Sequence, residues 1–188
     1  MRHRLTKITT KQGDNGRTRI ANGDIKLKSD IRICAIGDID ELNAALGLVK
    51  ALLKSYPYDD CHEKDLIFIQ NRLFDIGGEL ALPENTVLEM DSVIFLEAQI
   101  DAINSKLPAL KEFVIPGENY ISAQTHLARC IARRAERQLV ALNQECSELN
   151  LISLQFINRL SDYLFVLSRV FARQNNSVEL QWNNTKET

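Results

Sequence analysis

Apolar residues recur every three or four positions over five long stretches of this sequence. This spacing places the apolar side chains on one face of an α-helix. It predicts helices at about residues 31–53, 60–82, 91–107, 120–143 and 151–174. No series of strands with alternating polarity is visible. The pattern therefore predicts an all-α protein, an antiparallel five-helix bundle in the up-down arrangement of ferritin-like proteins.

Residues 1–30 lack this periodicity, and we expect them to form an irregular, glycine-containing arm ahead of the bundle. Residues 31–174 then make up the helical bundle, and residues 175–188 a flexible tail. A chain of 188 residues is long enough to bury one substantial core, so the sequence predicts a single domain.

Within the arm, residues 9–18 allow two interpretations. The pair Asn15-Gly16 is typical of a hairpin turn. The same stretch also suits a phosphate cradle, because glycines let backbone N–H groups approach an anion and Thr10, Lys11 and Thr18 add further donors. The spacing differs from that of a Walker A loop, and the local sequence leaves both interpretations open.

Composition and charge narrow the class of partner. The chain is 45% hydrophobic and 26% charged with a net charge of −2, which gives no overall attraction to nucleic acid or to a membrane surface. It has neither the apolar segment of a secretory signal nor a run of about 18 apolar residues. Its four cysteines form no C-x-x-C pair, so we expect reduced thiols in a cytoplasmic protein and no metal site built from side chains.

The predicted helix over residues 120–143 carries a dense group of charges: Arg129, Arg133, Arg134, Glu136 and Arg137. Guanidinium groups bind oxyanions in a planar, bidentate way, so this face suits a polyphosphate. The alternative is a solvated charged face with ion pairs between neighbouring turns.

Three carboxylates lie close together in the first predicted helix, at Asp38, Asp40 and Glu41. They form either an exposed acidic edge or a set from which one carboxylate pairs with an arginine of residues 129–137. In the last predicted helix, Asn158 and Asp162 interrupt an apolar sequence. Since packed polar groups need partners, these two residues belong either to a network with the arginines or to a binding site.

Phe113 lies in a segment without helical or strand pattern, between two predicted helices. An aromatic residue in such a segment either plugs the core or lines a ligand site.

Six segments, taken in order, resemble the PduO-type ATP:cob(I)alamin (corrinoid) adenosyltransferases. The resemblance extends over about residues 6–173, and the order and spacing of all six make it specific. The segments are Thr10 to Thr18, Lys28 to Asp30, Ala35 to Asn43, Phe113 to Gly117, His126 to Arg137 and Asn158 to Phe165.

The resemblance implies a five-helix bundle that assembles as a homotrimer with active sites between subunits. Its reaction transfers the 5′-deoxyadenosyl group of ATP to cobalt of cob(I)alamin and releases triphosphate. ATP and cobalamin are the substrates, Mg²⁺ binds through the ATP phosphates, and a reductase supplies electrons. Reduced cobalt is itself the nucleophile, so this chemistry needs no catalytic Ser, Cys or His, and we expect His126 to be a packed residue.

By matched position, the resemblance also implies roles for individual residues. Arg129 and Asp40 match an ion pair across the subunit boundary. Phe113 matches the aromatic residue under the corrin ring, which keeps the lower ligand off cobalt, and Asp162 helps to shape the same pocket. With Arg133 these two form the predicted catalytic group. The predicted ATP contacts are Thr10, Lys11, Gly13, Asp14, Gly16, Thr18, Lys28, Arg133, Arg134, Ala135, Glu136, Arg137 and Asn158.

Three positions depart from the family's usual residues: Ile36 replaces an aromatic residue, Glu118 a glycine and Thr125 a leucine. They leave the chemistry intact and bear on loop shape and corrin affinity. Two other functions remain compatible with the residues themselves. One is a helical ATP-binding phosphotransferase or sensor, and the other is a non-catalytic helical adaptor whose arginines bind an acidic partner.

Overall fold

The structure is a computed structural model that describes residues 9, 11–55, 61–174 and 177–183. The described residues form five helices and one short hairpin. The elements are β1 (Arg17–Arg19), β2 (Ile25–Leu27), α1 (Ile31–Leu53), α2 (Cys61–Ala81), α3 (Met90–Asn104), α4 (Tyr120–Cys146) and α5 (Leu151–Ala172). The predicted five-helix, mainly α fold is confirmed, and α4 extends three residues beyond its predicted end.

Side-chain caps explain where three of the helices begin. The carboxylate of Asp30 accepts a hydrogen bond from the backbone N–H of Arg32, at 2.9 Å, at the start of α1. The side chains of Asn119 and Asn150 do the same at the starts of α4 and α5. These caps satisfy backbone donors that the first helical turn leaves without an intrahelical partner.

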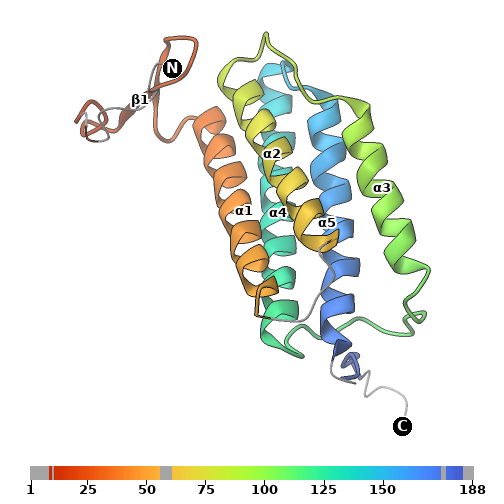
Figure 1. Cartoon of the computed structure of the whole chain (residues 1–188). Coiled ribbons are helices and arrows are strands. Elements are labelled where there is room, and N and C mark those ends of the chain that lie inside the picture. The colour runs from red at the N-terminus through yellow and green to blue at the C-terminus, as the bar shows by residue number, and fades with distance from the viewer. Residues whose placement is uncertain (1–8, 10, 56–60, 175–176, 184–188) are drawn as a thin grey trace.

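Successive helices run in opposite directions along a common axis (Figure 1). Helix α4 packs against both α1 and α5. Ala128, Ala132 and Ala135 lie on its inner face and are fully buried, and small side chains at this spacing let neighbouring helices approach closely. Helix α4 therefore carries the packed centre of the bundle on one face and its arginines on the other. In the described part of the chain, no helix has the length and apolarity needed to cross a membrane.

The arm contains the antiparallel hairpin β1–β2, in which Thr18 lies opposite Lys26. Its turn lies at Asn22-Gly23, where Gly23 has a φ of 96°, a value that glycine adopts without steric cost. The pair Asn15-Gly16 instead ends a separate turn before β1, closed by a 3.2 Å hydrogen bond from the N–H of Gly16 to the carbonyl of Gly13. The arm projects away from the bundle beside the start of α1 (Figure 1).

Residues 177–183 lie against the connection between α3 and α4, an interaction that the sequence does not predict. Gln181 bridges to Val114 in antiparallel fashion, and the N–H of Trp182 donates to the carbonyl of Phe113 at 2.7 Å. The end of the described chain therefore fixes the backbone on both sides of Phe113.

A buried ion pair holds this segment in place. The guanidinium of Arg169 on α5 donates to the carboxylate of Glu179 at 2.8 and 3.2 Å, and both side chains are buried. The same guanidinium donates to the carbonyl of Pro108 at 2.7 Å. Arg169 thus joins α5, the α3–α4 connection and the C-terminal segment at one point.

Candidate functional site

The described arm residues enclose a hollow of about 520 Å³, to whose lining they contribute three cationic side chains and no carboxylate. We call it the arm hollow. Such a lining attracts anions, and guanidinium groups match phosphate geometry. It is lined by Gln12, Gly13, Arg17, Thr18, Arg19, Ile25 and Lys28.

Backbone geometry brings Lys28 onto the loop at the mouth of this hollow. The N–H of Lys28 donates to the carbonyl of Gly16 at 2.9 Å. A Cβ atom at Gly13 would lie 3.1 Å from Nζ of Lys28 and 3.3 Å from the carbonyl of Arg17, so glycine makes this close approach possible without displacing its neighbours. Gly16 and Lys11 both have a positive φ, 78° and 58°. The predicted residues Gly13, Gly16, Thr18 and Lys28 thus lie together, as a phosphate cradle requires.

Two other predicted members of this loop are not part of the described lining. Asp14 is exposed and does not line the arm hollow. Thr10 lies outside the described residues, so its predicted role stays a prediction.

Arg133, Arg134 and Arg137 form an exposed group on α4, which we call the arginine face. Arg137 donates to the backbone carbonyl of Arg133 at 3.0 Å. Arg133 and Arg137 form no ion pair with the described carboxylates of this chain. Two guanidinium groups are therefore left to bind an external anion.

Arg134 has a different partner. Its guanidinium bonds to the carboxylate of Glu41 and lies 3.7 Å from that of Asp38. The hydrogen bond to Glu41 is the main cause that raises the pKa of Arg134. This confirms the hypothesis that a carboxylate of the first helix pairs with an arginine of residues 129–137. It also makes Arg134 a link between α1 and α4.

Asn158 is the centre of a polar chain that crosses three helices. Its amide nitrogen donates to Glu136 on α4 at 2.9 Å. Its amide oxygen accepts from the guanidinium of Arg159 at 2.6 Å, and Arg159 in turn bonds to Glu97 on α3 at 2.8 Å. Of the alternatives that the sequence left open for Asn158, the network with α4 is present, although its α4 partner is Glu136.

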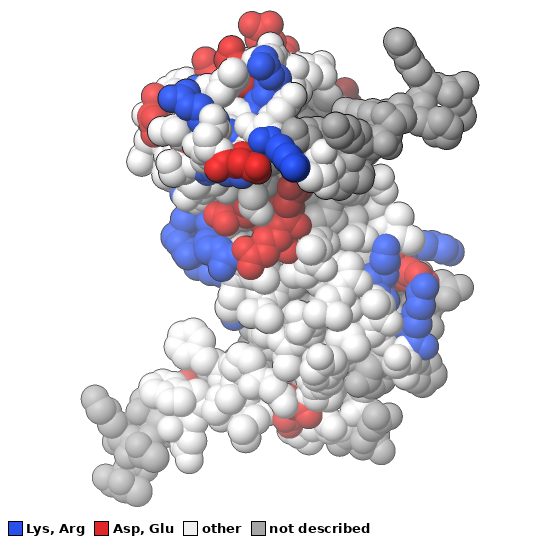
Figure 2. Space-filling view, turned by 90° about the vertical axis from the view of Figure 1, so that its left-hand side faces the viewer, with Lys and Arg blue, Asp and Glu red and all other residues white. Residues whose placement is uncertain are grey.

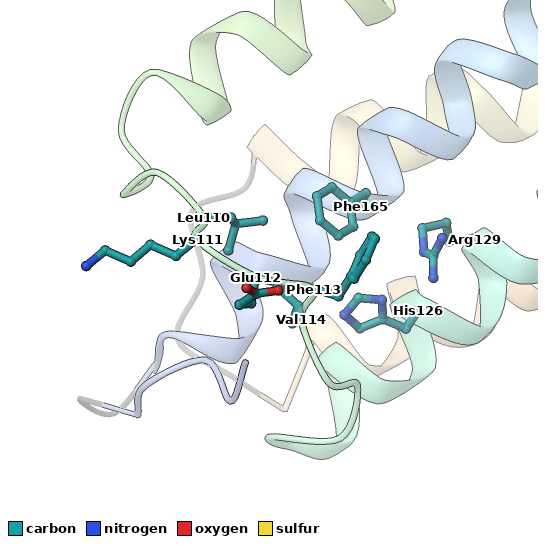
Figure 3. Close-up of a pocket in the computed structure, with 8 residues that line it drawn as sticks. All are labelled: Leu110, Lys111, Glu112, Phe113, Val114, His126, Arg129 and Phe165. Carbon is teal, nitrogen blue, oxygen red and sulfur yellow. The ribbon is translucent and has the colours of Figure 1, made fainter. Parts of the chain in front are cut away.

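A second cavity, of about 510 Å³, opens beside the connection between α3 and α4 (Figure 3). We call it the apolar cavity. Phe113 is 79% exposed and its ring projects between Phe165 and His126 (Figure 3). Phe113 therefore lines a cavity and does not plug the core, and its role at a ligand site stays a prediction. The cavity is lined by Leu110, Lys111, Glu112, Phe113, Val114, His126, Arg129 and Phe165.

His126 and Arg129 supply the polar groups of the inner wall of this cavity. The imidazole of His126 is 3% exposed, and burial, followed by the nearby Arg129 charge, lowers its pKa to about 4. The guanidinium carbon of Arg129 lies 5.9 Å from the centre of the Phe165 ring. The expectation that His126 is packed agrees with its burial, but it also lines a cavity.

Three predicted site residues lie apart from these groups. The methyl group of Ala135 is fully buried in the bundle, so we assign it to helix packing. Asp162 is exposed on α5 and does not line the apolar cavity. Asp40 is exposed and forms no ion pair with Arg129 among the described residues of one chain, which leaves the predicted pair between subunits as a prediction.

Comparison with known proteins decides which family this geometry belongs to. The sequence pattern described as cobalamin adenosyltransferase matches residues 8–171, nearly the whole chain. The chain belongs to the cobalamin adenosyltransferase family. It is 42% identical to a cobalamin adenosyltransferase of Cupriavidus metallidurans over 188 residues, which is 100% of both chains. It is 41% identical to a corrinoid adenosyltransferase of Bacillus subtilis over 87% of this chain and 86% of the relative.

Solved structures of the family agree with this fold. A variant of the PduO-type ATP:corrinoid adenosyltransferase from Lactobacillus reuteri, complexed with cobalamin and ATP, superposes with a TM-score of 0.89. The two are 37% identical, and the match covers 95% of this chain and 100% of the other. Another variant of that enzyme, complexed with ATP, gives a TM-score of 0.86 at the same identity.

Sequence reasoning about this adenosyltransferase missed several residues of the sites. Arg17 and Arg19 line the arm hollow. Their spacing was a usable sign, because residues two positions apart in a strand point to the same face. Arg159 and Glu97 join the Asn158 network. No sequence signal marks that pairing, since the two residues lie 62 positions apart.

Proposed function

We propose that the protein transfers the 5′-deoxyadenosyl group of ATP to cobalt of cob(I)alamin, giving adenosylcobalamin and triphosphate. The observation that carries this proposal is that one chain has both cationic groups suited to a polyphosphate and a cavity lined by an exposed aromatic ring. Membership of the cobalamin adenosyltransferase family supports it.

The electron balance of this reaction explains which side chains are needed. An electron pair on cobalt(I) forms the cobalt–carbon bond at C5′, while the C5′–oxygen bond breaks and its pair leaves on the triphosphate. No proton is removed, so no general base is required. The protein holds C5′ in line with cobalt and stabilises the negative charge of the leaving group. We assign the second task to Lys28, Arg133 and Arg137.

Mg²⁺ is expected to accompany the nucleotide. Among the described residues, no group of three or more His, Cys, Asp or Glu side chains could hold a metal ion. The donors that fit the ion are therefore phosphate oxygens of ATP, with hydroxyl or carboxylate groups of the arm, such as Thr18 and Asp14, close by. Mg²⁺ would neutralise part of the triphosphate charge.

Phe113 is assigned to the face of the corrin away from ATP. Its ring is exposed, and its backbone carbonyl accepts a hydrogen bond from Trp182 of the C-terminal segment. An apolar wall at that place disfavours a lower ligand on cobalt, and four-coordinate cobalt(II) is easier to reduce. Asp162 is proposed to act at the edge of the same pocket.

A homotrimer with active sites between subunits accounts for the separation of these groups. In one chain the described lining of the arm hollow consists of arm residues, and the arm projects away from the bundle (Figure 1). An arm that reaches the arginine face of a neighbouring copy would complete the nucleotide site. A reductase partner and a cytoplasmic location complete the proposal.

A crossed pair of variants tests these assignments. Arg133→Ala should weaken ATP binding by about 10- to 100-fold, because a charge-assisted contact to phosphate is lost. Phe113→Ala should reduce turnover with cobalamin strongly and leave ATP affinity within about twofold. Titration calorimetry with ATP and the cobalamin absorbance change under reducing conditions measure the two effects.

Arg72→Ala and Phe74→Ala are the matched controls. Arg72 pairs with Asp75 on α2, and Phe74 is 69% exposed on the same helix. Neither control should change ATP affinity or turnover. Product analysis gives the contradicting outcome: release of ADP or pyrophosphate in place of triphosphate would mean a phosphotransferase or another nucleotide reaction, and absence of ATP binding would mean an adaptor.

A further inference from the structure

His126 combines deep burial with a position on the wall of the apolar cavity. It is 3% exposed and belongs to the lining of the cavity. Its ring lies 6.3 Å from the Phe165 ring, centre to centre, in an edge-on arrangement. Figure 3 shows the imidazole beside Phe113 and Arg129, on the inner side of the apolar cavity.

Neither ring nitrogen of His126 has a hydrogen-bond partner among the described residues. Buried polar atoms almost always have a partner, and leaving one without destabilises the folded protein. A histidine that served only to fill the core would be replaced at no cost by an apolar residue of similar size. The unpartnered nitrogens at a cavity wall instead point to a group that arrives from outside.

The charge state of the imidazole limits what that group can be. Burial and the Arg129 guanidinium hold the pKa of His126 at about 4, with Glu179 acting weakly in the opposite sense. At neutral pH the ring is therefore uncharged, with one N–H donor and one acceptor nitrogen. This pair of functions suits a neutral group that both accepts and donates, such as a primary amide.

We propose that His126 is a binding residue for the corrinoid and forms a hydrogen bond with one of its peripheral amide side chains. Corrinoids carry acetamide and propionamide groups around an apolar macrocycle. The aromatic wall of Phe113 and Phe165 suits the macrocycle, and His126 is the neutral polar group beside it. This inference rests on the proposed placement of the corrinoid in the apolar cavity.

The proposal predicts effects of opposite sign for His126→Leu. Without substrates, replacing an unpartnered polar ring by an apolar side chain should raise Tm by about 2–4 °C. With substrates, KM for cobalamin should rise by about 5- to 30-fold while the Kd for ATP stays unchanged. A core histidine without a ligand would leave KM for cobalamin unchanged in His126→Leu, whatever the change in Tm.

Two polar variants identify the nitrogen that binds. Asn places an amide group near the position of Nδ1, and Gln places one near that of Nε2. Either His126→Asn or His126→Gln should recover most of the affinity for cobalamin that His126→Leu loses. If neither variant recovers it while both keep the wild-type Tm, the hydrogen bond does not exist.

Three further outcomes would overturn the proposal. Dissociation of the His126→Leu assembly in sedimentation would show that the nitrogens meet a neighbouring subunit. Nitrogen hyperfine splitting in the EPR spectrum of bound cob(II)inamide, which has no lower base of its own, would show that the imidazole binds cobalt. Equal weakening of ATP and cobalamin binding would indicate general damage to the fold.

Phe113→Ala separates failure of this inference from failure of the proposed function. If Phe113→Ala impairs the use of cobalamin and His126→Leu does not, only the role of His126 is wrong. If neither variant affects cobalamin, the corrinoid does not bind in this cavity and the proposed placement is wrong as well.

Discussion

At the scale of single residues, the surroundings of a side chain decide between a packing role and a binding role. Phe113 and Phe156 are the same residue type, yet Phe113 is 79% exposed at a cavity and Phe156 is fully buried in the core. His126 shows the intermediate case, since it is buried and yet faces a cavity. Its unusual titration gives a prediction about stability.

When pH is lowered, the free energy of unfolding should decrease more in the wild-type protein than in His126→Leu. The pKa of His126 is about 4 in the folded protein and about 6.5 in an unfolded chain. As pH falls from 6.5 towards 4, the His126 imidazole binds a proton in the unfolded chain but not in the folded protein. The free energy of unfolding therefore decreases by up to roughly 3 kcal/mol. Above pH 6.5 the residue contributes no pH dependence.

Urea unfolding of both proteins at pH 7.5, 6.0 and 5.0, without substrates, measures this difference. The gap between the two proteins should widen as pH falls, because the Leu variant lacks the titrating group. Parallel pH profiles would mean that His126 titrates alike in the folded and unfolded states.

At the scale of elements, hydrogen-bonded polar side chains from different helices hold one another in position. Asn158 bonds to Glu136 and to Arg159 at once. A carboxylate only accepts and a guanidinium only donates, so the amide of Asn158 is fixed in one of its two orientations. Since Asn158 is a predicted ATP contact, we predict that Arg159 affects ATP binding through it.

A double-mutant cycle tests this coupling. Asn158→Ala should weaken ATP binding by about 10-fold and Arg159→Gln by about 3- to 10-fold, in line with the loss of one hydrogen bond. Because Arg159 acts through Asn158, the double variant should bind ATP no more weakly than Asn158→Ala alone. If the fold-change in the Kd for ATP of the double variant, measured by calorimetry, equals the product of the two single fold-changes, Arg159 acts independently of Asn158.

At the scale of the whole molecule, the linings of the arm hollow and of the apolar cavity have no residue in common among those described. The side of the molecule that carries α1 and the arm shows charged side chains in separate patches, with uncharged surface between them (Figure 2). On α1, Gly37, Ala44 and Leu48 are exposed. An uncharged, partly apolar surface of this kind is suited to contact with another copy.

Asp40→Ala should weaken assembly by about 2–5 kcal/mol if Asp40 and Arg129 form a buried pair between subunits. Sedimentation velocity over a dilution series measures it. Glu41→Ala is the matched control, because Glu41 bonds to Arg134 within its own chain and both side chains are about half exposed. Exposed pairs contribute at most about 1 kcal/mol. An unchanged profile for Asp40→Ala would remove that pair from the interface.

The sequence alone determined the features that depend on neighbouring residues. Helical periodicity and the crowding of arginines on one face both act within a few turns, so their positions could be predicted. The order and spacing of six short segments likewise indicated the family. What the local pattern could not determine was which of two Asn-Gly pairs turns the hairpin, since both carry the same conformational preference and only strand pairing selects Asn22-Gly23.

The tertiary structure decided which polar groups meet. Glu79 is buried and accepts hydrogen bonds from the backbone N–H groups of Val87 and Leu88, both at 2.6 Å, and from Ser153 on α5 at 2.8 Å. Arg169 forms an ion pair with Glu179, and Arg134 forms one with Glu41. Ala135 faces the core although its neighbours face outward. A buried charge such as that of Glu79 or Arg169 must be paired or hydrogen-bonded, and its partner is set by helix packing and not by position along the chain. The same packing brings the exposed Arg134 and Glu41 together.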